Sequence, residues 1–362
     1  MKNSFGNNIT ITLFGESHGA AIGAVLDGIA PGIAVDREYI AAKMAKRKST
    51  GDISTPRHEA DEVEFLSGVF EGKTTGTPIA VVIKNSDTKS RDYSKTRPLA
   101  RPGHADYTAF CKYHGYEDYR GGGHFSGRLT APIVALGAIC QNALQSKGIY
   151  IGTHIARCKK VSDRTFCDFK SDIISLENSA FPLLDMTKKE EIEKEILAAK
   201  ASLDSVGGVL ETAVYGMPAG VGEPFFDSVE SVLSHALFSI PAVKGVEFGA
   251  GFAICDMLGS EANDSFYMDG DKVRTRTNNN GGINGGITNG NEILFRCAIK
   301  PTPSVAKKQE TVNFFEGKDA EIEICGRHDP AILHRAAVVV DSVTAITICD
   351  LLSTRYGTDF LA

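Results

Sequence analysis

The order of strand-like and helix-like segments restricts the fold of this chain most strongly. Alternating residues predict a strand over Ile9–Phe14, and Ala20–Leu26 reads as a return strand after a tight turn. Two more strand-like segments, Val63–Leu66 and Pro78–Lys84, precede the long apolar segment Arg128–Gln145, which predicts a buried helix. Because strands come in runs with helices between the runs, the pattern favours an α+β fold with antiparallel sheets over a doubly wound parallel sheet.

Capping signals predict the other helices. Asp36 is expected to cap a helix that runs to about Lys48. Two capping boxes, Thr187 with Glu190 and Asp227 with Glu230, predict two further helix starts. Helical spacing gives these two helices apolar faces: Ile192, Ile196 and Leu203 on the first, and Val229, Val232, Leu233, Ala236 and Leu237 on the second. A strand over Glu292–Lys300 and a long helix over Ala331–Tyr356 complete what we expect to be a single interwoven domain, residues 1–362.

Length and composition exclude several classes of protein. The 362 residues carry 39 Lys and Arg against 45 Asp and Glu, a net charge of −6, whereas nucleic-acid and membrane-surface binding normally need a basic excess. No uninterrupted apolar stretch approaches the roughly 18 residues of a membrane span; the best run lies near Ala131–Cys140. The first ten residues lack the apolar segment of a secretory signal, so we expect a cytoplasmic protein.

Metal and dinucleotide motifs are not found in the sequence. The eight cysteines are widely spaced and no Cys/His pair has metal-ligand spacing, so we expect reduced, mostly buried thiols and no metal. Residues Gly68–Thr74 (GVFEGKT) resemble a phosphate-binding loop, but three residues separate the glycines where that motif has four, so we expect a turn between strands. No GxGxxG opens a helix after a strand, which gives a Rossmann fold no support.

Polar residues set among glycines are the candidates for chemistry. Gly15–Gly19 (GESHG) ends a strand and places His18 either in a cleft or in a turn bonded to backbone. In Arg101–Tyr107 (RPGHADY), proline and glycine set a rigid turn from which Arg101 and His104 project. Asp106 in that turn is as suitable for a helix N-cap as for a catalytic group.

The segment Arg120–Arg128 (RGGGHFSGR) leads into the predicted buried helix and points most directly to an anion. Glycines before a helix N-terminus expose backbone N–H donors. Arg128 in the first turn is disfavoured by the helix dipole unless an anion lies beside it.

Other segments leave two interpretations open. Lys300–Ser304 (KPTPS) is a proline-stiffened loop or part of a site, and Thr277–Gly290 (TNNNGGINGGITNG) is a flexible loop or a place where backbone approaches a ligand. In Gly326–Pro330 (GRHDP), Asp329 either caps the last helix, with Pro330 at its first position, or belongs to a site with the Arg and His beside it. The basic run Lys46-Arg47-Lys48 with Arg57 is a solvated helix end or an anion site.

An acidic chain thus concentrates Arg, Lys and His in glycine-rich turns. Guanidinium groups bind carboxylate and phosphate bidentately. The residues therefore predict an enzyme for a small polyanionic, phosphorylated substrate that uses histidine as proton donor or acceptor.

Seven segments, in this order, resemble those of the chorismate synthase family: GESHG, RPGHADY, DYRGGGxxSGR, AVKGVEFGxGF, GGINGGI, KPTPS and GRHDP. The resemblance implies a β-α-β sandwich of antiparallel sheets around helices, a homotetramer, and a carbon–oxygen lyase acting on phosphates. The implied reaction is a 1,4-anti-elimination of phosphate from 5-enolpyruvylshikimate 3-phosphate, which gives chorismate. It requires reduced FMN although there is no net redox change.

The resemblance also implies roles for individual residues. His18 would protonate the departing phosphate, His104 would protonate or stabilise the reduced flavin, and Asp329 would lie near flavin N5 and assist proton abstraction. The implied substrate contacts are Ser17, Arg47, Arg57, Arg101, Arg128 and Arg327. The implied flavin contacts are Arg47, His124, Phe125, Ser126, Ala242, Gly285, Lys300, Pro301, Thr302, Pro303, Ser304 and Arg327.

Two other functions remain open at this stage. One is a non-catalytic protein that binds flavin or an anion on the same fold; intact His18, His104 and Asp329 speak against it. The other is a flavin oxidoreductase with net electron transfer, which the missing dinucleotide motif disfavours. NADPH is expected only if the enzyme reduces its own flavin. No nucleic acid or membrane partner is expected.

Overall fold

Two five-stranded antiparallel sheets enclose a layer of helices in the computed structural model, which describes residues 2–49, 51–54, 61–85, 97–324 and 329–362. The first sheet has the order β1-β2-β3-β7-β4, and the second has the order β11-β16-β10-β8-β9. The first consists of β1 Ser4–Phe5, β2 Thr10–Gly15, β3 Ala21–Asp27, β7 Ile79–Lys84 and β4 Glu64–Phe65. The second consists of β11 Val243–Phe248, β16 Ile293–Ile299, β10 Gly208–Tyr215, β8 Tyr150–Cys158 and β9 Val161–Ser162. The predicted α+β sandwich of antiparallel sheets is confirmed.

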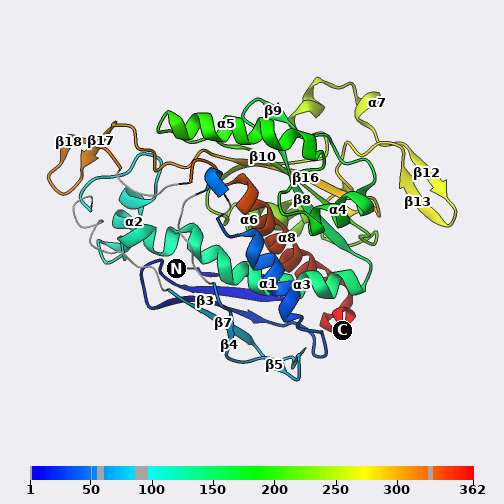
Figure 1. Ribbon diagram of the computed structural model, residues 1–362. Coiled ribbons are helices and arrows are strands. Elements are labelled where there is room, and N and C mark those ends of the chain that lie inside the picture. Colours follow the sequence, from blue (N-terminus) through cyan, green and yellow to red (C-terminus); the bar gives the residue numbers. More distant parts are fainter. Residues whose placement is uncertain (1, 50, 55–60, 86–96, 325–328) are drawn as a thin grey trace.

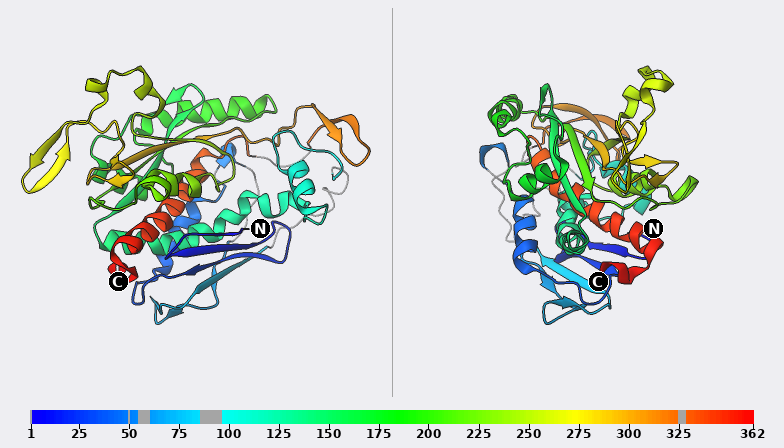
Figure 2. Two further views of the ribbon diagram at one scale, coloured as in Figure 1. Left: turned by 180° about the vertical axis from the view of Figure 1, so that it is seen from behind. Right: turned by 90° about the vertical axis from the view of Figure 1, so that its right-hand side faces the viewer.

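The helix layer between the sheets is built around two apolar helices. Helix α3 (Thr130–Ser146) packs on β3 and β7 of the first sheet, and α8 (Leu333–Tyr356) packs on β8 and β10 of the second. The two helices also pack on each other, and Figure 2 shows them between the two sheets. One continuous cluster of buried side chains includes both sheets and the helices between them.

The other helices are α1 Arg37–Lys46, α2 Asp106–Tyr113, α4 Phe169–Asn178, α5 Lys189–Ala201, α6 Val229–Leu237 and the short α7 Gly259–Ala262. Four hairpins complete the described structure: β5 Val69–Phe70 with β6 Lys73–Thr74, β12 Phe266–Asp269 with β13 Lys272–Thr275, β14 Ile283–Asn284 with β15 Ile287–Thr288, and β17 Gln309–Asn313 with β18 Lys318–Ile322. The β12–β13 and β17–β18 hairpins project from opposite ends of the molecule (Figure 1). The expected turn in Gly68–Thr74 is confirmed as the β5–β6 hairpin.

Several helix starts differ from the sequence-based expectation. Asp36 does cap α1, but α5 is preceded by a 3₁₀ turn whose N-cap is Asp185, which accepts from both the amide and the hydroxyl of Thr187. The Thr187–Glu190 box is therefore wrong. Leu203 lies beyond the end of α5, with a φ of 58° and 57% of its surface exposed, so it does not share the apolar face of Ile192 and Ile196.

The cap of α6 is also displaced by one residue. Ser228, not Asp227, accepts the amide of Ser231. Ser228 directly precedes Val229, the first residue of the helix, so Ser228 is the N-cap that the Asp227–Glu230 box predicted to be Asp227. The expected apolar face is confirmed for Val229, Leu233, Ala236 and Leu237, which are buried, with Val232 partly buried.

Helix α8 is long and apolar enough on average to cross a membrane, and it is the only described helix that meets this test. Its whole apolar window is buried inside the protein. A helix in the core of a globular protein has this character, because protein packs around all of its faces. The carboxylate of Asp350 on α8 accepts the amides of Asn7, Asn8 and Ile9, which fixes the N-terminal strand region to the last helix.

Candidate active site

The turn Gly121–Gly123 brings the two predicted catalytic histidines together. A Cβ on Gly121 would lie 2.2 Å from Nδ1 of His18, and one on Gly122 would lie 3.4 Å from Nε2 of His104. Both glycines also have positive φ values, 59° and 84°, in which L side chains are strained. Since adjacent Cα atoms are about 3.8 Å apart, the two imidazoles flank neighbouring positions of one backbone turn.

The GESHG segment forms the turn between β2 and β3 and is fastened to this glycine turn. The amide of Ser17 donates to the carbonyl of Gly123 at 3.0 Å, and Nδ1 of His124 donates to the carbonyl of Gly15 at 2.9 Å. His18 is buried, with its Nδ1 3.3 Å from the hydroxyl of Ser17. The predicted pair Ser17 and His18 therefore lies at the edge of the first sheet against the glycine turn.

The RPGHADY segment supplies the other histidine. Nδ1 of His104 lies 2.8 Å from Oδ1 of Asp106, and the guanidinium of Arg101 also contacts this carboxylate. Helix α2 has Ala105 as its N-cap without a side-chain bond, so the expectation of Asp106 as a cap is wrong. Burial would raise the pKa of Asp106, but hydrogen bonds from Arg101 and His104 outweigh it and hold that pKa far below its usual range.

Two predicted substrate arginines meet at a buried carboxylate. The guanidinium of Arg47 lies 2.7 Å from Oδ2 of Asp61, and that of Arg128 bonds to Oδ1 of the same side chain. Burial alone would raise the pKa of Asp61, but Arg47 and Arg128 hold it below 3.8. Nε of Arg47 is buried and has no hydrogen-bond partner among the described residues. The arginine site thus keeps one donor, Nε of Arg47, for an anion.

The arginine pair connects to the histidine turn through one amide side chain. Nε of Arg128 donates to Oδ1 of Asn85 at 3.1 Å. Nδ2 of Asn85 donates in turn to the carbonyls of Glu16 and Gly19, which flank His18. The position of Arg128 is therefore coupled to the position of the GESHG turn.

Asp329 is joined to the same network from the other side. It bonds to NH1 of Arg335, while Nε of Arg335 donates to the carbonyl of Arg47 at 2.7 Å. Helix α8 begins only at Leu333, with Ile332 as an N-cap that makes no side-chain bond. Of the two alternatives for Asp329, the helix cap is therefore wrong, and its carboxylate is oriented by Arg335 next to Arg47.

The Lys300–Ser304 segment lies against the His104 turn. Nζ of Lys300 bonds to the carbonyl of Gly103, and a Cβ on Gly103 would lie 3.4 Å from Cβ of Pro303. The hydroxyl of Thr302 is buried without a hydrogen-bond partner among the described residues. An orphaned hydroxyl, a cation and an exposed glycine backbone beside His104 suit the phosphate and polar ring edge of a flavin.

The remaining predicted flavin contacts are dispersed. Ala242 has a φ of 77° and accepts the amide of Lys300 at 2.9 Å, so it adjoins that segment. Ser126 caps the 3₁₀ turn before α3, and Phe125, 38% exposed, packs on Tyr113. Gly285 lies in the β14–β15 hairpin, where an added Cβ would meet nothing within 4 Å. Arg57 and Arg327 lie outside the described residues.

The Gly/Asn tract is ordered by a carboxylate that the sequence analysis did not single out. Asp264 accepts from the hydroxyl of Thr277, from the amides of Asn279 and Asn280, and from the side chain of Asn280. The tract is thus a structured loop, and the interpretation as a flexible one is wrong.

Sequence reasoning also missed three residues of the site: Asp61, Asn85 and Arg335. None lies in a glycine-rich motif, and each acts through a partner far away in sequence. Arg335 had the one usable signal, since it follows Asp329 by six residues at the start of a predicted helix.

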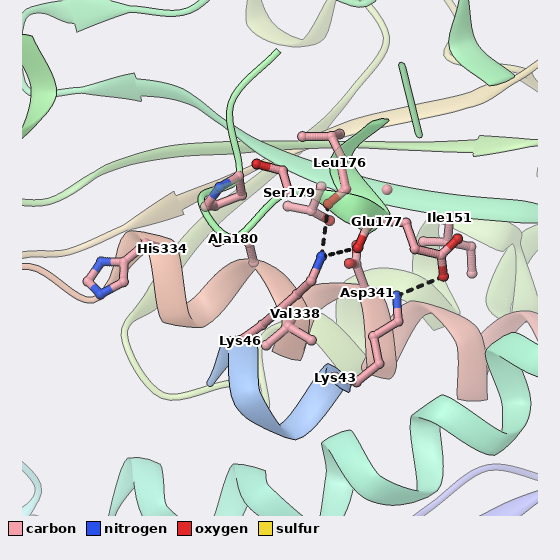
Figure 3. Close-up of a pocket in the computed structure, with 14 residues that line it drawn as sticks. Lys43, Lys46, Ile151, Leu176, Glu177, Ser179, Ala180, His334, Val338 and Asp341 are labelled. Carbon is pink, nitrogen blue, oxygen red and sulfur yellow. Dashed lines mark hydrogen bonds and ion pairs between the residues drawn. The ribbon is translucent and has the colours of Figure 1, made fainter. Parts of the chain in front are cut away.

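A separate polar crevice lies between α1, α4, β8 and α8 (Figure 3). Nζ of Lys46 donates there to the carbonyls of Leu176 and Glu177 at the end of α4, and Nζ of Lys43 lies 3.4 Å from Glu177. These lysines neutralise a helix C-terminus and a carboxylate, which is a structural use of charge. Lys46 precedes Arg47, so the crevice holds the end of α1 that carries this arginine.

Comparison with known proteins agrees with this geometry. The family model for chorismate synthase matches residues 9–353. The chain is 46% identical over 350 residues to a chorismate synthase of Pyrococcus abyssi, covering 97% of both chains. It is 44% identical over 366 residues to one of Methanocaldococcus jannaschii, covering 97% of this chain and 96% of that one. A crystal structure of chorismate synthase superposes with a TM-score of 0.75 at 27% identity, covering 97% of this chain and 94% of the other. The chain belongs to the chorismate synthase family, whose members are phosphate-eliminating lyases of aromatic amino-acid biosynthesis.

Proposed function

We propose that this chain converts 5-enolpyruvylshikimate 3-phosphate to chorismate at the site formed by His18, His104 and the Arg47–Arg128 pair. In the reaction a C–O bond to phosphate breaks, a C–H proton leaves and a second ring double bond forms, so no electrons are gained or lost. The observation that carries the proposal is the glycine turn that places both histidines beside an arginine site with unused donor capacity.

The residues divide the work by charge. Arg47 and Arg128, together with Arg57, Arg101 and Arg327 from the family resemblance, bind the phosphate and the two carboxylates of the substrate. His18 donates a proton to the departing phosphate, which lowers the charge that the leaving group must carry. Asp329, held by Arg335, assists removal of the proton. Ser17, 3.3 Å from the His18 ring, contacts the substrate.

Reduced FMN is the proposed cofactor. When bound, it supplies electron density that stabilises charge on the allylic carbon as phosphate leaves. Lys300–Ser304, Ser126, Ala242, His124, Phe125 and Gly285 would hold it, together with Arg47 and Arg327. His104 stands beside the Lys300 segment and would hold a proton at the reduced ring. NADPH is required only if the chain reduces its own flavin.

At larger scale we propose a cytoplasmic homotetramer whose protomers are single domains. The continuous buried cluster that includes both sheets supports the single domain. The open space beside Gly285, where an added Cβ would meet nothing within 4 Å, supports a hairpin that a second protomer can approach.

Phosphate release under anaerobic conditions tests the function. We expect the purified protein with photoreduced FMN to release one phosphate per chorismate formed, with the flavin still reduced afterwards. Oxidation of one flavin per turnover would indicate an oxidoreductase instead. Flavin binding without phosphate release would indicate the non-catalytic alternative.

A further inference from the structure

Asp106 is the central residue of a hydrogen-bonded cluster next to the site, which consists of Arg101, His104 and Asp106. Its Oδ1 lies 2.8 Å from Nδ1 of His104 and 2.7 Å from NH2 of Arg101, and its Oδ2 lies 2.7 Å from Nε of Arg101. The amide of Arg101 also donates to Oδ2 at 3.1 Å. The side chains of Arg101 and Asp106 are 13% and 19% exposed, so water competes little for these bonds.

The geometry of this three-residue cluster selects one tautomer of His104. Asp106 is a carboxylate and can only accept, so a bare Nδ1 lone pair 2.8 Å from Oδ1 would be repelled. A proton on Nδ1 converts this repulsion into a charge-assisted hydrogen bond. NH2 of Arg101 also lies 3.0 Å from Nδ1 of His104, but this NH2 can only donate. Both NH2 of Arg101 and Nδ1 of His104 point to Oδ1 of Asp106.

The other ring nitrogen consequently faces the glycine turn as an acceptor. A Cβ on Gly122 would lie 3.4 Å from Nε2 of His104, and Gly121 beside it contacts His18. The Nδ1 bond therefore fixes both which atom of His104 can take up a proton and the direction in which that atom points.

We propose that Asp106 is a positioning residue for the reaction: it fixes His104 in the Nδ1-protonated tautomer, with Nε2 presented toward the reacting groups. The hydrogen bonds between Asp106 and Arg101 stabilise this arrangement. The inference rests on the proposed function for the role of His104 as a proton-carrying group. It narrows the expectation for Arg101 to a substrate contact through NH1, because its Nε and NH2 serve Asp106.

Substitution Asp106→Asn tests the kinetic part. The amide of asparagine would donate to Nδ1 and move the ring proton to Nε2. We expect kcat to fall by about 10²-fold or more, as for other misdirected catalytic groups, while KM changes little. On a His104→Ala background the same substitution is expected to have almost no further effect on kcat, because there is no ring to orient. Asp172→Asn is the matched control, since Asp172 clamps Arg164 and the amide of Cys167 in the same way without a histidine.

Solid-state ¹⁵N spectra of histidine-labelled protein test the tautomer without any turnover. We expect the His104 signals, assigned by their loss in His104→Gln, to show Nδ1 protonated in the wild type at pH 8 and Nε2 protonated in Asp106→Asn. An Nε2-protonated wild-type ring would overturn the inference, and so would an undiminished penalty on the His104→Ala background. If the wild type releases no phosphate, the proposed function fails, whereas the spectra still decide the role of Asp106.

Discussion

One buried carboxylate separates two arginines that would otherwise repel each other. Asp61 is 8% exposed and bonds to both Arg47 and Arg128, so the three side chains carry a net charge of +1. A phosphate or a substrate carboxylate that reaches these arginines meets the unused Nε of Arg47. The carboxylate thus keeps the site folded when it is empty and moderates its affinity when it is full.

Asp61→Asn is expected to destabilise the empty protein by roughly 3–5 kcal/mol, because it removes the counter-charge that the two buried arginines share. Inorganic phosphate should then raise the melting temperature of the variant more than that of the wild type, since it replaces the lost charge. Thermal melts with and without phosphate measure this. Glu247→Gln serves as control, because its ion pair with Arg296 is much more exposed. Equal phosphate effects in variant and wild type would show that anions do not bind at this pair.

The two histidines flank the same glycine turn, and we expect replacement of either one alone to lower turnover. His18→Ala and His104→Ala should each lower turnover by about 10²–10⁴-fold, the usual contribution of general acid–base catalysis. Melting temperatures should change little, because both rings adjoin the glycine turn instead of the apolar core. His235→Ala is the control, since that ring packs on Phe5 at 5.3 Å and lies outside the site. A variant that melts much earlier than wild type would identify its histidine as structural.

Asp329 offers a sharper distinction now that it is excluded as a helix cap. Asp329→Asn keeps the shape and a hydrogen bond to Arg335 but loses the charge that assists proton removal. Turnover should therefore fall by about 10²-fold or more while the melting temperature stays within a few degrees. Asp204→Asn, which alters the exposed pair with Lys307, should leave turnover unchanged. Full activity of Asp329→Asn would remove Asp329 from the mechanism.

At the scale of elements, α1 and α8 carry the site on their ends and are held together by the charged crevice of Figure 3. Burial raises the pKa of Asp341, on α8 in this crevice, to about 6, and its Oδ1 has no hydrogen-bond partner among the described residues. The folded protein therefore retains a proton that the unfolded chain releases above its pKa of 3.8. The contribution of Asp341 to the free energy of unfolding is therefore fully present below about pH 4 and is lost as the pH rises through 6.

The free energy of unfolding of Asp341→Asn should consequently increase relative to that of the wild type as the pH rises. A pKa difference of about 2 corresponds to roughly 3 kcal/mol between pH 4 and pH 8. Urea unfolding at the two pH values measures it, with Asp269→Asn on the exposed β12–β13 hairpin as a control that should show no such trend. If the difference between variant and wild type were the same at both pH values, Asp341 would not be a strained carboxyl group.

The elements themselves were predictable where hydrophobic period decided them. The β2–β3 pair, α3, the apolar face of α6 and the strand β16 all fall within a few residues of the expected ranges, because burial fixes their patterns. Helix starts were less predictable: Asp185 and Ser228 displace Thr187 and Asp227, since a capping box marks several adjacent candidates and only local geometry chooses among them.

The site could be predicted only as far as its motifs extend along the sequence. Glycine-rich turns revealed His18, His104 and Arg128, and the family resemblance supplied their roles. The bonds from Asp61 to Arg128 and from Arg335 to the carbonyl of Arg47 could not be predicted, because they join residues 67 and 288 positions apart and no local pattern encodes such a pairing. Long-range ion pairs of this kind are determined by how the sheets and helices pack, which a sequence pattern does not specify.

For the whole molecule, three highly exposed aromatic rings favour assembly. Phe225, Phe226 and Phe252 are 87%, 89% and 82% exposed, although large apolar side chains are normally buried or grouped at interfaces. Phe225 and Phe226 are adjacent in a 3₁₀ turn before α6, next to the segment that packs on the β14–β15 hairpin carrying Gly285. An interface there would cover Phe225 and Phe226 and bring protein against the hairpin.

Light scattering should give a mass four times the chain mass of 38.8 kDa, and the double substitution Phe225→Ser with Phe226→Ser should shift it toward smaller species. Burying each phenylalanine contributes about 1.5–3 kcal/mol, so losing both should weaken association by roughly 10²–10⁴-fold per protomer. Tyr116→Ser is the matched control, because this ring is 92% exposed but lies near α2, away from the hairpin. The melting temperature of the dissociated species reports whether each protomer still folds. A double variant that keeps the full mass would place the interface elsewhere, and if it also keeps wild-type flavin affinity, Gly285 does not act through this surface.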